Sequence, residues 1–198
     1  LGASTVEAQI GVSLDVSKGI LAALKGEPVS TAVNMAPVSP QVMKVIAPYL
    51  TLAERLGGTV TALAEGPVEK VEVVYNGEIT EVNTGMLTTA VIKGMLNPIM
   101  ENEVNYVNAP GLAKERGIKV TEVKEKEVED FTNLITVKAM IGGKELAVQG
   151  TLFGTEGRIV RINKFRVDVD PHARILVCPH INRPGVIGTV GTLLGGKN

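Results

Sequence analysis

The chain has 198 residues, of which 44% are hydrophobic and 21% charged, so it is long enough for one good-sized core or two small domains. Its net charge of −1 creates no global field toward polyanions or membrane surfaces, and an aromatic content of 3% without Trp offers few rings for base stacking. Since a signal peptide and an apolar stretch of about 20 residues are also missing, the sequence predicts a cytoplasmic protein with no nucleic-acid or membrane partner.

Residues 4–25 are predicted to form a helix, because Ser4 and Glu7 fit a capping box. Four apolar residues then fall on one face at helical spacing: Ile10, Leu14, Leu21 and Leu24. The pattern ends at Gly26. Residues 27–40 contain three prolines and no hydrophobic period, so we expect an extended connector at a domain boundary.

A second helix is expected to begin at Ser39-Pro40, because proline suits the first helical turn. Pro48 is expected to break or restart it, since an interior proline removes a backbone hydrogen bond. Beyond Pro48 the helical pattern continues to Gly66-Pro67. Its apolar residues recur at steps of three or four: Leu50, Ala53, Leu56, Val60 and Leu63.

The hydrophobic period then changes to two, which predicts strands. Alternation through Val71, Val73 and Tyr75 reaches Asn76-Gly77, the strongest short signal for a hairpin turn. The chain is therefore expected to return along residues 79–82 as the second strand of a hairpin.

Two short helices are predicted next, over residues 86–96 and 110–116, with Gly117 ending the second. Alternation then returns in strands joined by turns at Gly142-Gly143 and Asn163-Lys164. Because helices and hairpins occur in blocks, the expected fold class is α+β, with mixed helices and antiparallel hairpins rather than a doubly wound parallel sheet.

Charge is segregated along the second half of the chain. Residues 124–130 alternate acids and bases and are interpreted as a solvated edge. Cations gather between residues 158 and 183, where only Asp168 and Asp170 oppose them: Arg158, Arg161, Lys164, Arg166, Arg174 and Arg183. Several of these cations on one strand face would recognise phosphate or carboxylate, and a solvated strand face is the alternative.

The last segment joins a β-branched run, residues 174–181, to glycines at every third position from Gly185. A dinucleotide site needs G-x-G-x-x-G at the turn into the helix, so these glycines are interpreted as a helix face made slim for packing. Cys178 lies within the run and is predicted to be a buried, inert thiol. One cysteine excludes an internal disulfide.

His180 and Asn182 are candidate ligand contacts, because positions i and i+2 of an extended chain project to the same side. An imidazole with a carboxamide suits a small zwitterion, and a surface histidine beside a turn-forming asparagine is the alternative. With only two histidines and no H-E-x-x-H, G-x-S-x-G or P-loop pattern, we expect no metal cluster and no assembled active site.

Five segments in order resemble the C-terminal half of the long-form D-3-phosphoglycerate dehydrogenases. They are LGASTVEAQ at the start, VNAPGLAKERGI (107–118), NLITV (133–137), GTLFG with RIVRIN (150–163), and HINRPGVIGTVGTLLG (180–195). This resemblance covers the whole chain. It implies a part of an NAD-dependent oxidoreductase that converts 3-phosphoglycerate to 3-phosphohydroxypyruvate, the first step of L-serine biosynthesis.

The resemblance also implies a division into three parts. Residues 1–29 resemble the terminal helix segment of the catalytic unit, and residues 30–172 resemble the intervening, allosteric-substrate-binding domain. Residues 173–198 resemble the N-terminal fragment of a ferredoxin-like ACT regulatory domain. Because one strand and one helix do not complete such a module, this last part is expected to be poorly anchored in isolation.

Roles of individual residues follow from the same resemblance. Leu1, Gly2 and Ala3 match positions beside the bound NAD, whereas the family's catalytic histidine would precede Leu1, so no catalytic residue is expected here. His180 and Asn182 match contacts to the effector L-serine.

Arg158 matches a cationic position of an anion site in the intervening domain, but a second cationic position of that site falls on Asp170. The departure puts the site in question.

The function implied is therefore the regulatory and assembly portion of a homo-oligomeric dehydrogenase, a tetramer in the intact protein. The alternative is a non-enzymatic amino-acid-sensing module, or the β component of an iron–sulfur L-serine dehydratase, which has related domains. The opening LGAST with its helix suits the dehydrogenase and has no obvious use in a free-standing sensor.

Overall fold

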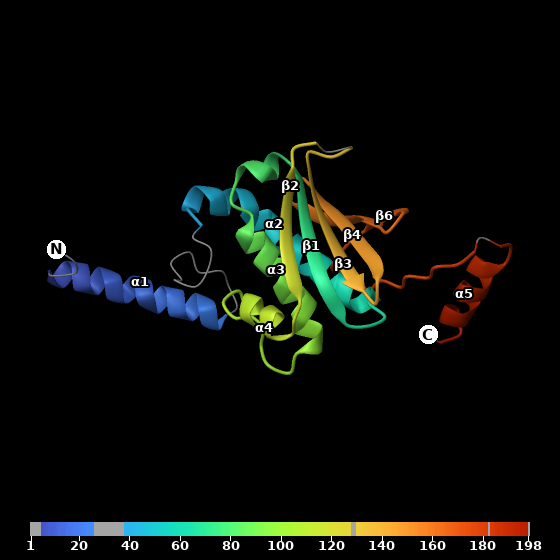
Figure 1. Cartoon of the computed structure of the whole chain (residues 1–198), viewed down its shortest axis with the longest axis horizontal. Coiled ribbons are helices and arrows are strands. Elements are labelled where there is room, and N and C mark those ends of the chain that lie inside the picture. Colours follow the sequence, from blue (N-terminus) through green and yellow to red (C-terminus); the bar gives the residue numbers. More distant parts are fainter. Residues whose placement is uncertain (1–4, 26–37, 128–129, 182, 198) are drawn as a thin grey trace.

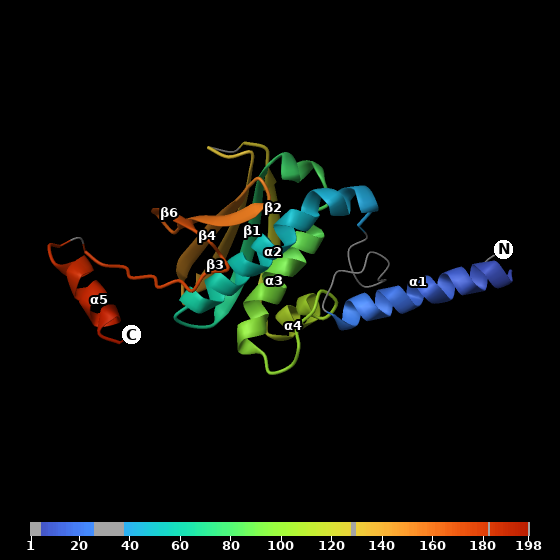
Figure 2. The same ribbon diagram turned by 180° about the vertical axis from the view of Figure 1, so that it is seen from behind.

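The structure, a computed structural model, describes residues 5–25, 38–127, 130–181 and 183–197. Its body is one six-stranded sheet with two helices, α2 (Pro40–Leu63) and α3 (Gly85–Leu96), packed on a single face (Figures 1 and 2). The opposite face of the sheet carries no helix of the described residues. The expected α+β class is confirmed.

The sheet has the strand order β2-β1-β3-β4-β5-β6. All neighbouring strands are antiparallel except β1 and β2, which are parallel and joined by a crossover through α3, η2 (Asn97–Ile99) and α4 (Ala109–Glu115). The six strands are β1 (Val68–Gly77), β2 (Lys119–Glu125), β3 (Asn133–Ile141), β4 (Lys144–Phe153), β5 (Glu156–Ile162) and β6 (Phe165–Val169).

The hydrophobic core lies between the sheet and its two helices. The predicted apolar face of α2 is confirmed, because Leu56 and Val60 are fully buried and Leu63 packs at the margin. Val73 and Tyr75 of β1 meet this face from the sheet. Alternate residues of the central strands therefore point into the core, and the residues between them form the open face.

Pro48 does not interrupt α2, contrary to expectation, since the helix runs continuously from Pro40 to Leu63. Its axis changes direction along its length (Figure 2), the usual response to an interior proline. Ile46 and Leu50 are buried on either side of Pro48. The packing of both halves onto one core outweighs the lost hydrogen bond.

The predicted hairpin at Asn76-Gly77 is wrong. Gly77 ends β1 with φ of 90°, and the chain continues into the short helix η1 (Glu78–Glu81) instead of a returning strand. The reason is tertiary, because both edges of β1 are already occupied by β2 and β3. A residue such as Ile79 therefore has no free edge of β1 to pair with.

The other predicted turns are confirmed. Gly142 and Gly143 both have positive φ between β3 and β4, Asn163 has φ of 50° between β5 and β6, and Gly117 ends α4 with φ of 74°. The charged run that begins at Lys124 lies at an edge strand of the sheet, and residues 124–127 and Asp130 are exposed, as expected of a solvated edge. Glu129 of this run lies outside the described residues.

The predicted first helix is present as α1 (Val6–Leu24) and extends away from the sheet (Figure 1). The amide of Ala8 donates to Thr5 Oγ1 at 3.2 Å, so Thr5 provides a side-chain cap, while Ser4 and the connector at residues 26–37 lie outside the described residues. Its large apolar side chains, such as Ile10, are more than half exposed.

The predicted strand at residues 174–181 is not formed, because no described strand pairs with this segment. Cys178 is consequently exposed, and the prediction of a buried thiol is wrong. The helix α5 (Val186–Gly195) follows, with Gly185 at its N-cap in the left-handed region, and none of its residues is buried. The packing role of its glycines stays a prediction.

Candidate functional site

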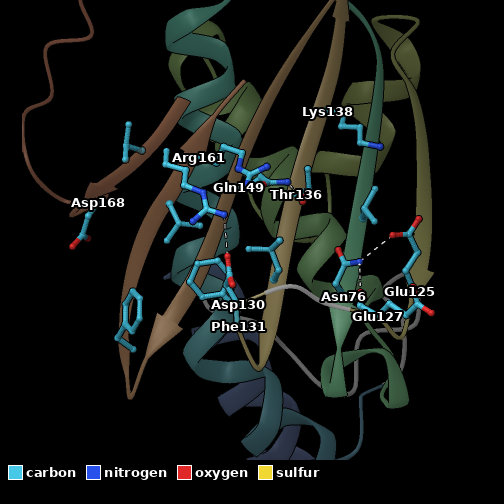
Figure 3. A pocket seen from close by; sticks show the side chains of 16 residues that line it. Asn76, Glu125, Glu127, Asp130, Phe131, Thr136, Lys138, Gln149, Arg161 and Asp168 are labelled. Carbon is cyan, nitrogen blue, oxygen red and sulfur yellow. Dashed lines mark hydrogen bonds and ion pairs between the residues drawn. The ribbon is translucent and has the colours of Figure 1, made fainter. Parts of the chain in front are cut away.

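The open face of the sheet carries a groove of about 660 Å³ (Figure 3). Its floor consists of the outward-facing residues of β1, β3, β4 and β5. Its two ends are formed by the edge strands β2 and β6 and by the segment before β3 that contains Asp130 and Phe131. Charged side chains line the groove.

Four polar residues form one row across the floor of the groove, each paired in register with the next. Thr136 of β3 lies opposite Gln149 of β4, Gln149 opposite Arg161 of β5, and Arg161 opposite Arg166 of β6. Gln149 Nε2 donates to Thr136 Oγ1 at 3.1 Å. Residues directly opposite on antiparallel strands have β-carbons about 5 Å apart, so Gln149, Arg161 and Arg166 hold hydrogen-bond donors close to one another, whereas Thr136 is buried.

A bulge in β5 directs Arg161 into this row. Gln149 pairs with Arg161 and Gly150 with Ile159, which leaves Val160 without a partner. Val160 and Arg161 consequently both line the groove, whereas Ile159 and Ile162 stay in the core. Bulges commonly re-aim side chains in this way.

Most charges of the groove are balanced within the chain. Arg166 Nη2 lies 3.0 Å from Asp130 Oδ2, and Lys138 Nζ lies 3.1 Å from Glu72 Oε1. Arg161 differs, because no carboxylate of the described residues lies within 4.0 Å of it. With Arg166 beside it, Arg161 is a cation whose charge an incoming anion would balance.

Aromatic rings border the β6 end of the groove. Phe131 and Phe153 meet edge to face, with ring centroids 6.2 Å apart, and Phe153 remains more than half exposed. The arrangement therefore combines cationic and amide donors with an apolar wall, as small-molecule sites commonly do.

Arg158, the predicted anion contact, lies among carboxylates. Glu156 is 3.1 Å, Asp168 3.7 Å and Asp170 3.9 Å from its guanidinium. Asp170, which stands where the resembling family has a second cation, thus adds an acid beside Arg158. An anion at Arg158 would compete with three acids. The anion role of Arg158 stays a prediction, with the local charge against it.

Asp170 is held in its charged form by the turn after β6. The backbone N–H of His172 donates to Asp170 Oδ1 at 2.9 Å, and His172 Nδ1 lies 3.0 Å from the same oxygen. These hydrogen bonds, together with the charge of Arg158, lower the pKa of Asp170.

His180 is exposed, and its Nδ1 lies 3.0 Å from the carbonyl oxygen of Cys178. All residues that line the shallow hollow beside it come from residues 180–188. Asn182, and Leu1, Gly2 and Ala3 of the predicted NAD contact, lie outside the described residues. The structure therefore tests neither the pairing of His180 with Asn182 nor the NAD contact.

Among the described residues no group of three or more His, Cys, Asp or Glu side chains could hold a metal ion. No described helix is both long and apolar enough to cross a membrane. The residues that sequence reasoning missed are Thr136 and Gln149, because only strand register places them beside Arg161.

Comparisons with known proteins agree with the resemblance noted in the sequence. Residues 45–163 match the family described as the D-3-phosphoglycerate dehydrogenase intervening domain. Proteins named D-3-phosphoglycerate dehydrogenase are similar over the whole chain, with 39% identity in Archaeoglobus fulgidus and 41% in Synechocystis. A Bacillus subtilis protein of the same name is 37% identical over 98% of the chain.

The chain spans 38%, 36% and 37% of the length of these three relatives, respectively. The matched range of 119 residues, from 45 to 163, includes α3, α4 and strands β1 to β5, and most of α2. The chain therefore belongs to the family of the D-3-phosphoglycerate dehydrogenase intervening domain.

Proposed function

We propose that this chain is the regulatory and assembly portion of an NAD-dependent D-3-phosphoglycerate dehydrogenase. The observation that carries the proposal is the similarity of the whole chain to proteins of that name, of which it spans little more than a third. The intact protein would oxidise 3-phosphoglycerate to 3-phosphohydroxypyruvate. NAD would be bound by its catalytic part, with Leu1, Gly2 and Ala3 beside it.

The fold supports a role in binding rather than in chemistry. The groove offers Arg161 and the neutral side chain of Gln149, and none of the described residues that line it is a nucleophile with an adjacent base. Such a site would hold an anionic effector without reacting with it. The proposal therefore places anion binding at Arg161 in preference to Arg158, whose charge three acids already balance.

His180 and Asn182 are proposed as a second effector site, for L-serine, in an ACT domain of the intact protein. The exposure of His180 supports this role, because an effector can reach its ring. Assembly into a homotetramer in the cytoplasm completes the proposal. The exposed apolar residues of α1 and α5, including Ile10 and Ile187, would then be covered by other parts of the intact protein.

The test is an assay of two proteins from the same gene. The protein encoded by the complete reading frame should form NADH from 3-phosphoglycerate and NAD, and the present chain alone should not. A complete protein that lacks this activity, or activity in the chain alone, would contradict the proposal. A complete protein without a dinucleotide-binding unit would favour an amino-acid sensor instead.

A further inference from the structure

The second edge of the sheet, β6, is a strand without a partner on its outer side. β5 pairs with Phe165, Arg166 and Val169 on its inner side, with a register shift that leaves Val167 and Asp168 without a partner on β5. No backbone hydrogen bond among the described residues reaches the outer side, so the N–H and C=O groups there are able to pair with another strand.

We propose that β6 is an interaction surface for a second copy of this chain, through antiparallel pairing of the two β6 strands about a two-fold axis at Val167. The strand reads Phe-Arg-Val-Asp-Val, and this order is complementary to its own reverse. In the register that pairs the whole strand, Arg166 lies opposite Asp168 of the second copy, and the reverse contact is identical.

Charge complementarity identifies the occupant as another copy. Arg166 and Asp168 have side chains that are 73% and 79% exposed, so each remains accessible although it already pairs within the chain. Because partners in a ladder project to the same face, two Arg–Asp contacts would form on the groove side of the joined sheet.

The apolar residues of β6 fit the same register. Phe165 would lie opposite Val169 of the second copy, and Val167 opposite its own counterpart. Phe165 is 55% exposed, so its ring has apolar surface that a second strand could cover. Pairing would remove this ring from water, and aromatic with β-branched pairs are favourable across strands.

The other edge strand is less suited to pair with itself. In the register that pairs the whole of β2 with itself, Lys119 would lie opposite Glu125 at both ends, but Glu122 would lie opposite Glu122 at the centre, which is unfavourable. Both oxygens of Glu122 are also engaged within the chain, with Thr84 at 2.5 Å and Thr88 at 2.6 Å. The two edges therefore differ, and self-association is assigned to β6 alone.

The proposal does not depend on dehydrogenase activity, and it joins two grooves into one continuous open face. Arg166 and Asp168 both line the groove, so each copy would contribute charges at the border of its partner's groove. The contact is short, with five residues on each side, so we expect weak, concentration-dependent dimers of the isolated chain that high salt weakens further.

A charge swap tests the register. Arg166→Asp places Asp opposite Asp168 at two contacts and should raise the dimer dissociation constant by roughly tenfold, measured by sedimentation equilibrium. Asp168→Arg should do the same. The double variant Arg166→Asp/Asp168→Arg should restore dimers, although it leaves like charges beside Asp130 and Arg158 within the chain. If the double variant dimerises again, the recovery must come from the contact between the two copies, because the pairs within each chain are made worse.

A disulfide at the two-fold axis provides a second measurement. With Cys178 replaced by Ser, Val167→Cys should form a cross-linked dimer on mild oxidation, because directly opposed residues lie within disulfide range. The matched control is Thr121→Cys on the exposed edge β2, which should not cross-link. A chain that stays monomeric, or that dimerises regardless of the charge reversals and without a cross-link in the Val167→Cys variant, would overturn the proposal.

Discussion

Gly94 of α3 lies directly against the backbone carbonyl oxygen of Glu54 in α2, with no room between the two helices for a side chain. A β-carbon at Gly94 would overlap that oxygen. The same crossing holds Gly57 of α2 against the carbonyl oxygen of Val91, so each helix contributes one glycine. Lys93 then bonds both carboxylate oxygens of Glu54, at 3.0 and 2.9 Å. The crossing therefore depends on backbone contact.

Replacing Gly94 by Ala should destabilise the chain by about 3 kcal/mol or more, because the helices must separate to admit the methyl group. Urea unfolding followed by circular dichroism would measure the loss. Gly58→Ala is the matched control on the same helix pair, since its β-carbon would meet the Gly94 carbonyl oxygen at an ordinary 3.5 Å. The control should be neutral or stabilising by up to about 1 kcal/mol. Equal losses of unfolding free energy in the two variants would contradict the close approach of Gly94 to the Glu54 carbonyl oxygen.

Gly77→Ala should be strongly destabilising for two reasons. The residue has φ of 90°, and an added β-carbon would overlap the carbonyl oxygen of Thr132. Gly142→Ala is the control, because it shares the positive φ but would meet no atom within 4 Å. We expect Gly142→Ala to lower the free energy of unfolding by about 1 kcal/mol through backbone strain, and Gly77→Ala to lower it by at least twice that amount. Thermal unfolding midpoints of the two variants would separate the effects.

The stability of the chain should fall above pH 10. Burial raises the pKa of Tyr75, whose hydroxyl is 2.9 Å from Thr88 Oγ1, and burial beside Glu54 raises the pKa of Tyr106 from 10.0 to about 12. Because both folded values exceed the unfolded one, their contribution is complete below pH 10 and is lost as pH rises through the folded pKa.

Urea midpoints measured between pH 8 and pH 12 would test this pH dependence. At one pH unit above 10, the neutral Tyr75 should account for about 1.4 kcal/mol of lost stability. The double variant Tyr75→Phe/Tyr106→Phe should show a shallower decline, since it has no phenol at either position. An unchanged slope in that variant would assign the decline to other groups.

Anion binding should depend on Arg161 rather than Arg158. Arg161→Ala should weaken the binding of inorganic phosphate or citrate to the chain by roughly tenfold or more, because a charge-assisted hydrogen bond is lost. Isothermal titration calorimetry would measure it. Arg158→Ala is the control and should change the affinity little. A larger loss of affinity in Arg158→Ala than in Arg161→Ala would show that the anion binds at Arg158.

Serine inhibition of the intact protein should weaken when His180 is replaced by Ala. The substitution removes one polar contact of the proposed effector, and about 1–3 kcal/mol corresponds to roughly fivefold to 150-fold in the inhibition constant. The uninhibited rate should be unchanged, because His180 is exposed and lies outside the sheet. Inhibition constants equal to those of the parent would count against the role of His180.

Local signals in the sequence predicted most elements correctly. The apolar period of α2, the positive-φ turn at Gly142-Gly143 and the stop at Gly117 depend on residues within a few positions of each other. The motifs distributed along the chain also pointed to the right family. Those features need no knowledge of which distant segments meet.

Tertiary structure decided what local signals could not. Asn76-Gly77 ends a strand and makes no hairpin because β1 is flanked on both sides, and Pro48 stays inside a helix because both halves are packed. The cations at the end of the domain were visible in the sequence, but their roles were not. A bulge at Val160 turns Arg161 into the groove, whereas acids from β6 and its turn balance Arg158.

The sequence by itself therefore determined the family, the α+β class and the places where helices and turns occur, since these follow from periodicity, glycine, proline and motif order. Only the tertiary structure decided which edges of the sheet are free and which charges are balanced. The physical reason is that strand pairing and charge compensation join residues far apart in the chain, such as Arg166 and Asp130.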